Sequence, residues 1–419
     1  MSSRQAVLAA AYAHGPGKDI RPGPAPAHRR PSVAAATVPL TELARTGPAG
    51  DRLVRVLRTA LAPRRFEPWN GFNEHRAYPS PRAAYLVDVV LRTGAGDWLF
   101  DPIRDLLRAT TPTSAPAVDL AELDIDLAKL ADGPVLTLLE RPRRMPAGYG
   151  SLADALAALE AGHVAGVLVE AAAGHGLLAA GDSTCGAAGD YTGLTVRFGA
   201  PATPAWPRRR LTAARSSGLG PRGLGPDPRP LPAEVLDRLT AAAYRLPPGS
   251  PAAWPGLRHT LAVGNVTGRV AGWYDLDPAG PTVANPAVGA LAVADPTAIR
   301  PADAIGQLQQ AYSYPRSEVD VAGLPLAWLI SADVGASVRA GGPGAYRRLL
   351  HTAGAVAQHV CSAAAVDGLF CRPVRAVREG VAEAAAGLPA GHDLIYLLLI
   401  GRSRVRDFAY DLSNPEVPL

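Results

Sequence analysis

The sequence has little cysteine, with only Cys185, Cys361 and Cys371 among 419 residues. Their spacing matches no metal-ligand pattern, and an odd number of thiols argues against a framework of disulfide bonds. Such sparse cysteine usage is typical of proteins from reducing compartments. We therefore expect a cytoplasmic protein without a metal site.

Charged and aromatic residues are also scarce, at 19% and 6% of the chain, and the formal net charge is only +5. The arginines are scattered, apart from a short cluster at residues 208–210 inside a proline-rich stretch. A basic face with interleaved aromatic residues is missing, which disfavours nucleic-acid binding. No apolar run reaches the length of a membrane span, so we expect no membrane segment either.

Hydrophobic residues are plentiful, at 48%, and 419 residues suffice for two to three domains with a large core. Proline and glycine concentrate in two regions. Residues 1–50 are predicted to form an extended N-terminal arm, with apolar islands at 38–40 and 43. Residues 201–232 are predicted to be a linker.

An Ala/Gly-rich segment recurs in the chain. Residues 353–369 have helical spacing of small and apolar residues, and Gly368 lies where a helix could end. Residues 161–177, which lie 192 positions earlier, match this segment at nine of seventeen positions. Small residues allow another backbone or a flat ligand to approach closely.

A second pair of segments repeats in the same order, with residues 96–102 similar to residues 272–278. Strand-like segments at 135–139 and 326–331 lie between the members of the two pairs, and 394–400 is predicted to be a last strand. Helices are expected at 51–61 and 233–244. We infer an α+β protein with a tandem duplication, in which 51–200 and 233–419 are two domains that form an internal pseudo-dimer.

The order of these motifs resembles the nitroreductase-like flavoprotein family, in particular the azoline dehydrogenases of thiazole/oxazole-modified peptide pathways. Residues 79–86 are similar to a Pro-Ser-Ala-Gly-Ala-Leu-Tyr-Pro loop, with Arg82 where the family often has Gly. The strand end at 272–278 and the helix start at 353–359 also resemble family motifs. The resemblance implies an antiparallel-rich sheet flanked by helices in each domain, with degeneration of the first.

The resemblance further implies FMN bound between two such domains. A family Arg-Ser segment holds the flavin phosphate, and Arg215, Ser216 and Ser217 in the linker resemble it. An arginine fork and hydroxyl groups suit a phosphate. The family's Pro-Ser loop covers the flavin ring and is matched by Pro79, Ser80 and Arg82.

The loop that matches the family motif more closely thus belongs to the first domain. The segment that matches the family's phosphate-binding motif more closely belongs to the second. We therefore expect one composite FMN site, while its pseudo-symmetric counterpart, with a shortened loop at 250–255, is inactive. Arg372 and Arg402 are further candidates for phosphate binding.

The Lys-Tyr pair of azoline dehydrogenases is missing from residues 339–348. Oxidation of an azoline requires removal of a ring proton as well as hydride transfer, so a base is expected nearby. The candidates are the hydroxyl groups of three tyrosines and one imidazole: Tyr312, Tyr314, Tyr346 and His351. Cys361 and Cys371 are interpreted as small buried residues.

Three functions remain open at this point. The first is an FMN-dependent dehydrogenase that oxidises thiazolines or oxazolines to azoles in a ribosomally made precursor peptide, together with a cyclodehydratase. The second is another nitroreductase-like oxidoreductase that acts on a small molecule. The third is a flavin-free scaffold of a peptide-modifying complex. Further association into a homo-oligomer is also open.

Overall fold

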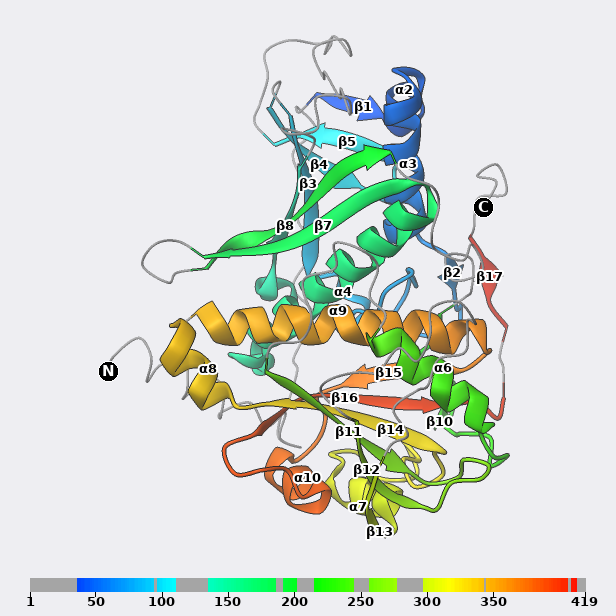
Figure 1. Ribbon diagram of the computed structural model, residues 1–419. Coiled ribbons are helices and arrows are strands. Elements are labelled where there is room, and N and C mark those ends of the chain that lie inside the picture. The colour runs from blue at the N-terminus through cyan, green and yellow to red at the C-terminus, as the bar shows by residue number, and fades with distance from the viewer. Residues whose placement is uncertain are drawn as a thin grey trace, which may run out of the picture.

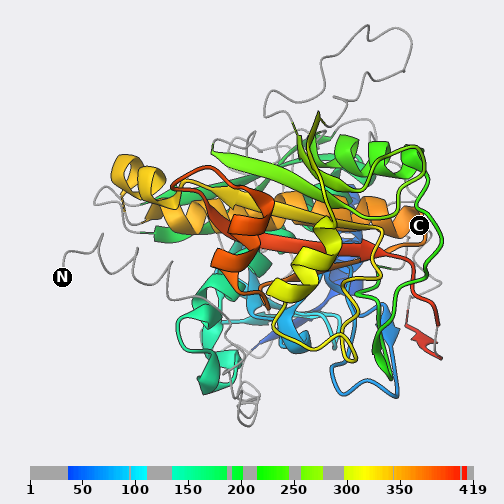
Figure 2. The ribbon, with the colours of Figure 1, turned by 90° about the horizontal axis from the view of Figure 1, so that it is seen from below.

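The computed structural model describes residues 36–93, 96–110, 135–185, 191–201, 215–244, 256–276, 297–342, 344–405 and 408–412. They form two halves, each with one main antiparallel sheet and one long helix (Figure 1). The long helices, α4 (Leu152–Gly174) and α9 (Gly344–Val366), lie between the two sheets. Seen from below, the sheet of the second half lies in front of α9 (Figure 2).

The first half begins with a strand and two helices and continues into a seven-stranded sheet in the order β1-β5-β4-β3-β6-β8-β7. Its elements besides α4 are β1 (Thr37–Pro39), α2 (Leu40–Arg45), α3 (Pro48–Leu61), β2 (Arg65–Phe66), β3 (Val87–Thr93), β4 (Gly96–Asp101), β5 (Leu106–Ala109), β6 (Val135–Glu140), β7 (Leu177–Cys185) and β8 (Tyr191–Pro201).

The second half has a six-stranded sheet in the order β13-β12-β11-β14-β16-β15. Its elements besides α9 are β9 (Leu219–Gly220), β10 (Gly223–Leu224), α6 (Ala233–Tyr244), β11 (Leu257–Val263), β12 (Gly272–Leu276), β13 (Thr297–Pro301), α7 (Ala304–Ala311), β14 (Leu326–Ala332), α8 (Val334–Gly341), β15 (Phe370–Val374), α10 (Glu379–Ala386), β16 (Asp393–Gly401) and β17 (Tyr410–Asp411).

The two sheets have the same strand order, because β5-β4-β3-β6-β8-β7 corresponds position by position to β13-β12-β11-β14-β16-β15. The first sheet differs by one added edge strand, β1. Each long helix also occupies the same place in both halves, directly before β7 or β15. The predicted α+β duplication is therefore confirmed.

The close contact between α4 and α9 is reciprocal. A Cβ added to Gly162 would lie 2.1 Å from the carbonyl oxygen of His351, and a Cβ added to Gly354 would lie 2.1 Å from that of Leu159. Both pairs are related by the same shift of 192 positions. Such a self-complementary contact is the mark of a two-fold interface, here within one chain.

Both long helices are apolar around most of their circumference, as expected for buried helices. By length and composition each could span a membrane, which corrects the expectation that no apolar run has that length. However, 89% of the apolar window of α4 and 83% of that of α9 is buried inside the protein. The apolar side chains are thus used for packing the two halves.

Part of the predicted N-terminal arm belongs to the folded body. Residues 36–50 form β1, α2 and the start of α3, and Leu40 and Leu43 are fully buried. The apolar islands of this segment therefore pack into the core, and Pro48 is tolerated because it lies in the first turn of α3. Residues 1–35 lie outside the described residues.

Two segments of the chain cross between the halves. In the predicted linker, residues 202–214 lie outside the described part, but Ser216 packs beside the second sheet, where its carbonyl oxygen accepts a hydrogen bond from the Cys371 amide at 3.2 Å. Near the C-terminus, β17 pairs with β2 of the first half. The halves are thus joined by strand pairing as well as by α4 and α9.

Candidate functional site

A cavity of about 420 Å³ lies between the two halves. This volume is in the range of small-molecule sites. The first half contributes the loop after residue 69 and one side of α4, while the second half contributes the segment at 215–219, the residues after α7, and strands β15 and β16. Neither half alone has a complete wall.

The predicted Pro-Ser loop forms part of this wall, and Pro79, Ser80 and Arg82 all line the cavity. The Ser80 hydroxyl accepts a hydrogen bond from the Tyr85 amide at 2.8 Å and donates one to Glu160 Oε2 at 2.7 Å. The serine thus ties the loop to α4.

The same loop has an unusual backbone. Arg82, Ala83 and Tyr85 have φ values of +54°, +51° and +46°, in the left-handed region that favours glycine. This explains why a glycine would suit position 82. Residues with such backbone conformations persist where surrounding contacts hold them in place, which is often at functional sites.

Only two of the three residues in the predicted phosphate-binding segment line the cavity. Arg215 and Ser217 line the cavity, whereas Ser216 does not. The Ser216 hydroxyl accepts a hydrogen bond from the Gly218 amide at 3.1 Å, and its carbonyl oxygen is bonded to Cys371. Ser216 therefore shapes the turn, while its two neighbours face the cavity.

The other two arginines predicted to bind phosphate differ in their position relative to the cavity. Arg372 on β15 lines the cavity, but Arg402 does not, because it follows the end of β16 and lies near Asp227, whose amide donates to its carbonyl oxygen. Sequence reasoning missed Arg375, which lines the cavity at 6% exposure. No motif distinguished it from the neighbouring arginines.

Three cavity arginines carry buried guanidinium nitrogens without a hydrogen-bond partner among the described residues. They are Nε and Nη1 of Arg215, Nε of Arg372 and Nη1 of Arg375. A buried N–H group without a partner costs free energy. The cluster therefore has unused capacity for an anion such as a phosphate, which arginine binds well.

Two of the four predicted proton-transfer residues line the cavity, and two do not. Tyr312 and Tyr314 line the cavity; burial raises the pKa of Tyr312, and Tyr314 is 49% exposed. Tyr346 and His351 on α9 do not line it. Tyr346 interacts with the Arg375 side chain, and His351 Nε2 lies 3.0 Å from Glu140 Oε1. Both lie before the predicted helical segment at 353–369, so no helical pattern predicted where their side chains point.

Sequence reasoning also missed Glu160, the one carboxyl group among the described cavity residues. It lies on α4 and is 1% exposed. Burial raises its pKa to about 7, although the hydrogen bond from Ser80 acts in the opposite direction. Glu160 is one of three carboxyl groups on α4, with Asp154 and Glu170, so no sequence pattern singled it out.

A buried polar chain connects the cavity to the helix interface. His163 Nδ1 lies 3.1 Å from Gln358 Oε1, and His163 Nε2 lies 3.2 Å from the hydroxyl oxygen of Tyr396, a cavity residue. Burial lowers the pKa of His163 to about 3. The imidazole is therefore neutral, with Nδ1 donating to the amide oxygen and Nε2 accepting from the tyrosine. His163 is thus a buried packing residue with both ring nitrogens hydrogen-bonded.

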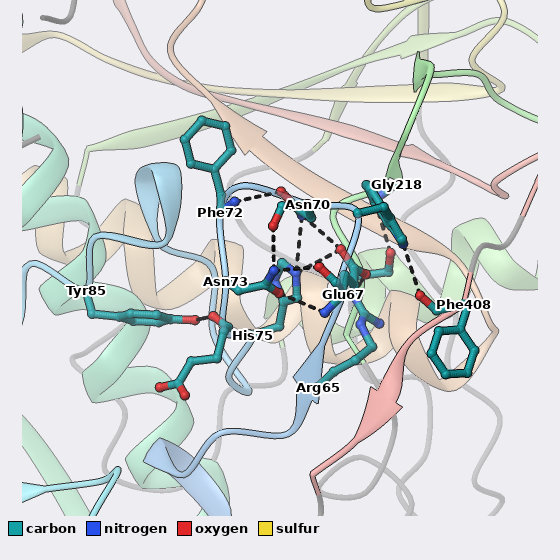
Figure 3. A network of polar contacts seen from close by, with 12 residues as sticks. Arg65, Glu67, Asn70, Phe72, Asn73, His75, Tyr85, Gly218 and Phe408 are labelled. Atoms are coloured by element: carbon teal, nitrogen blue, oxygen red, sulfur yellow. Dashed lines mark hydrogen bonds and ion pairs between the residues drawn. The ribbon is translucent and has the colours of Figure 1, made fainter. Parts of the chain in front are cut away.

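The loop after β2 forms part of the cavity wall, and Figure 3 shows the polar network within it. Glu67 Oε2 lies 2.9 Å from His75 Nε2 and accepts a hydrogen bond from Asn70 Nδ2 at 2.9 Å. Burial alone would raise the pKa of Glu67, but these hydrogen bonds outweigh it and lower the pKa. The network fixes Asn70, Phe72 and His75 in the cavity wall.

Comparison with known proteins identifies the fold. No family model matches the sequence, and no curated protein is similar to it. Over nearly its full length, the chain is similar in structure to a protein from Anabaena variabilis assigned to the nitroreductases, with a TM-score of 0.71 and 13% identity over 96% of this chain and 100% of that one. The fold is therefore nitroreductase-like, in tandem.

Two further solved structures match about half of the chain. An FMN-dependent nitroreductase from Clostridium difficile has 14% identity and a TM-score of 0.30, over 48% of this chain and 90% of that one. The E. coli microcin synthetase McbBCD complex, with truncated pro-MccB17 bound, has 16% identity and a TM-score of 0.36, over 47% of this chain and 72% of the matched one. The full-length match, at 13% identity, shows a shared fold.

Proposed function

We propose that this chain is an FMN-dependent oxidoreductase whose flavin binds in the cavity between the two halves. The observation that carries the proposal is the cluster of buried, unpartnered guanidinium nitrogens on Arg215, Arg372 and Arg375. They come from two separate segments of the second half, and they line a cavity whose other wall is the Pro-Ser loop. The nitroreductase-like fold supports the same choice of cofactor.

The cavity residues fit FMN in both charge and shape. The three arginines and the Ser217 hydroxyl would hold the phosphate, because a phosphate accepts several charge-assisted hydrogen bonds. The loop at 79–83 and Tyr85 would lie along the ring, where a compact loop and an aromatic side chain can approach a flat ligand. The flavin itself supplies two-electron redox chemistry, while the protein binds it and positions the substrate.

For the substrate we propose an azoline ring in a ribosomally made peptide, oxidised to a thiazole or oxazole. This rests on the resemblance of residues 79–86, 272–278 and 353–359 to the azoline dehydrogenases. The partners that follow are the precursor peptide and a cyclodehydratase, which forms the azoline. Oxidation of a small molecule by the same flavin is the alternative function.

Purification of the full chain tests the cofactor. We expect a yellow protein that releases FMN on denaturation, and the Arg215→Ala variant should lose the flavin. A colourless wild-type protein that does not bind added FMN would contradict the proposal and favour the scaffold function.

Incubation with an azoline-containing peptide tests the substrate. A mass decrease of two hydrogens per ring is the expected product signature. A flavin-loaded protein that leaves azolines unchanged but oxidises or reduces small molecules would support the alternative function.

A further inference from the structure

The wall of the cavity contains a carboxyl group that no flavin-binding role requires. Glu160 is 1% exposed, and its Oε2 accepts a hydrogen bond from Ser80 Oγ at 2.7 Å. Ser80 is part of the loop that the proposed function places along the flavin ring. The carboxyl group is therefore directly linked to that part of the cavity where a substrate would meet the flavin.

The other proton-bearing groups of the cavity are less suited to proton transfer. Tyr312 is buried, and Arg372 beside it only partly offsets the rise of its pKa. Tyr314 is half exposed to solvent. His75 is engaged with Glu67 through Nε2, and both its backbone amide and carbonyl bond to Arg65. Glu160 is enclosed, and the hydrogen bond from Ser80 Oγ holds its carboxyl group in place.

The groups around Glu160 set its ionisation. Burial raises its pKa to about 7, and the Ser80 hydroxyl, Arg76 and Arg144 lower it without cancelling that effect. Tyr78 and Tyr396 also interact electrostatically with this carboxyl group. Arg215 lies farther along the wall. His163, one turn along α4, is neutral because burial lowers its pKa. A group of this kind exchanges protons near neutral pH.

We propose that Glu160, held in place by Ser80, is the proton-transfer residue of this cavity. The proposal rests on the proposed function and replaces the tyrosines expected from the sequence. Its substrate class is a ring or chain with hydrogens on two adjacent atoms, one of which is acidic. An azoline of a modified peptide belongs to this class.

The step balances as a two-electron oxidation. Two adjacent C–H bonds of the substrate break, and a C=C double bond forms between the two carbons. One hydrogen leaves with its electron pair as a hydride, for which the oxidised flavin is the acceptor. The other leaves as a proton to the Glu160 carboxylate, which later returns it to water.

The first experiment is a pH titration of the visible absorption spectrum of the FMN-loaded, full-length protein. We expect a spectral midpoint near pH 7, its loss in Glu160→Gln, and its retention in Glu160→Asp. Ser80→Ala should move the midpoint to higher pH, because the serine hydroxyl stabilises the charged carboxylate. Glu234→Gln, at an exposed position on α6, is the matched control and should titrate as wild type.

The second experiment measures azoline oxidation by the same variants. The Glu160→Gln variant should bind FMN with wild-type affinity but turn over about 10²- to 10⁴-fold more slowly at pH 7, as is typical when a general base is lost. A titration and a rate that are unchanged in Glu160→Gln would overturn the assignment while the flavin site remains. A protein that binds no FMN in any variant would instead remove the proposed function, and the proton-transfer role with it.

Discussion

The two halves have the same strand order and the same central helix, but they carry different side chains at equivalent positions. Counting back 192 positions along the repeat, Arg372 corresponds to Ala180 and Thr352 corresponds to Glu160. Arg372 and Glu160 both line the cavity, whereas the hydroxyl of Thr352 bonds within its own helix to the carbonyl oxygen of Arg348. The two halves thus share one fold but carry different functional groups at equivalent positions.

This difference indicates a division of labour. The second half supplies Arg215, Arg372 and Arg375 to the cavity, and the first half supplies the Pro-Ser loop with Arg82 and the carboxyl group of Glu160. The shortened loop at 250–255, which would belong to the opposite site, lies outside the described residues. At Ala180 that opposite site has a methyl group where the cavity has a guanidinium.

The strongest way to break the pseudo-symmetry is at the helix contact. Gly162→Val and Gly354→Val should each destabilise the protein by about 3 kcal/mol or more, since each new side chain meets backbone that cannot move away cheaply. Thermal unfolding measures both. Gly166→Ala, whose Cβ would meet a Gln358 side-chain atom at 3.1 Å, is the milder control. Unequal effects of the two valines would contradict a reciprocal contact.

Replacing a cavity arginine by the residue at the equivalent position of the first half should weaken cofactor binding. Arg372→Ala copies Ala180 into the second half and should weaken FMN binding roughly 100-fold, because a buried charge-assisted contact to the phosphate is lost. Titration with FMN, followed by quenching of flavin fluorescence, measures the effect. Arg402→Ala, outside the cavity, is the matched control. Equal affinities of both variants would remove Arg372 from the site.

The ion pair between the halves should make stability depend on pH. Burial alone would raise the pKa of Glu140, but His351 and Arg347 outweigh it and lower the pKa to about 2, from 4.5 in the unfolded chain. This contribution is therefore complete above about pH 4.5 and is lost as the pH falls toward 2. Its size is about 3 kcal/mol. Denaturant unfolding of wild type and Glu140→Gln between pH 3 and 7 tests this, with a difference that should shrink at the acidic end.

The smallest expected effect concerns the left-handed loop. Arg82→Gly should stabilise the protein by about 1 kcal/mol, because an L-residue in this conformation costs about 1–2 kcal/mol and glycine does not pay it. Arg82→Ala removes the same side chain without relieving the backbone. A glycine variant that is no more stable than the alanine variant would show that other contacts decide the conformation of the loop.

The sequence was informative where a structural requirement left a recognisable residue type. The small residues at 161–177 and 353–369 predicted the central helices, because only glycine permits the contact seen at Gly162 and Gly354. The prolines at 79 and 81 likewise predicted a loop. Helix α9 nevertheless begins nine residues before the repeated segment, since its first turns contain no small-residue pattern.

Side-chain direction was less predictable. Arg375 was missed, and Arg402, a candidate for phosphate binding, is not among the cavity residues, because which arginine near a strand end faces the cavity depends on where the strand ends. Tyr346 and His351 lie in the first turns of α9, ahead of the predicted helical segment, and contact other partners. Glu160 was overlooked because the residue that positions its carboxyl group, Ser80, is 80 positions away in the sequence.

The most direct test of the account is the number of FMN molecules per chain. The flavin released from a known amount of fully loaded protein is quantified from its absorbance, with Arg215→Ala measured alongside. One composite site predicts one FMN per chain in the wild type and a deficit in the variant. Two FMN per chain would mean that the opposite site is intact, and none would contradict the flavin site altogether.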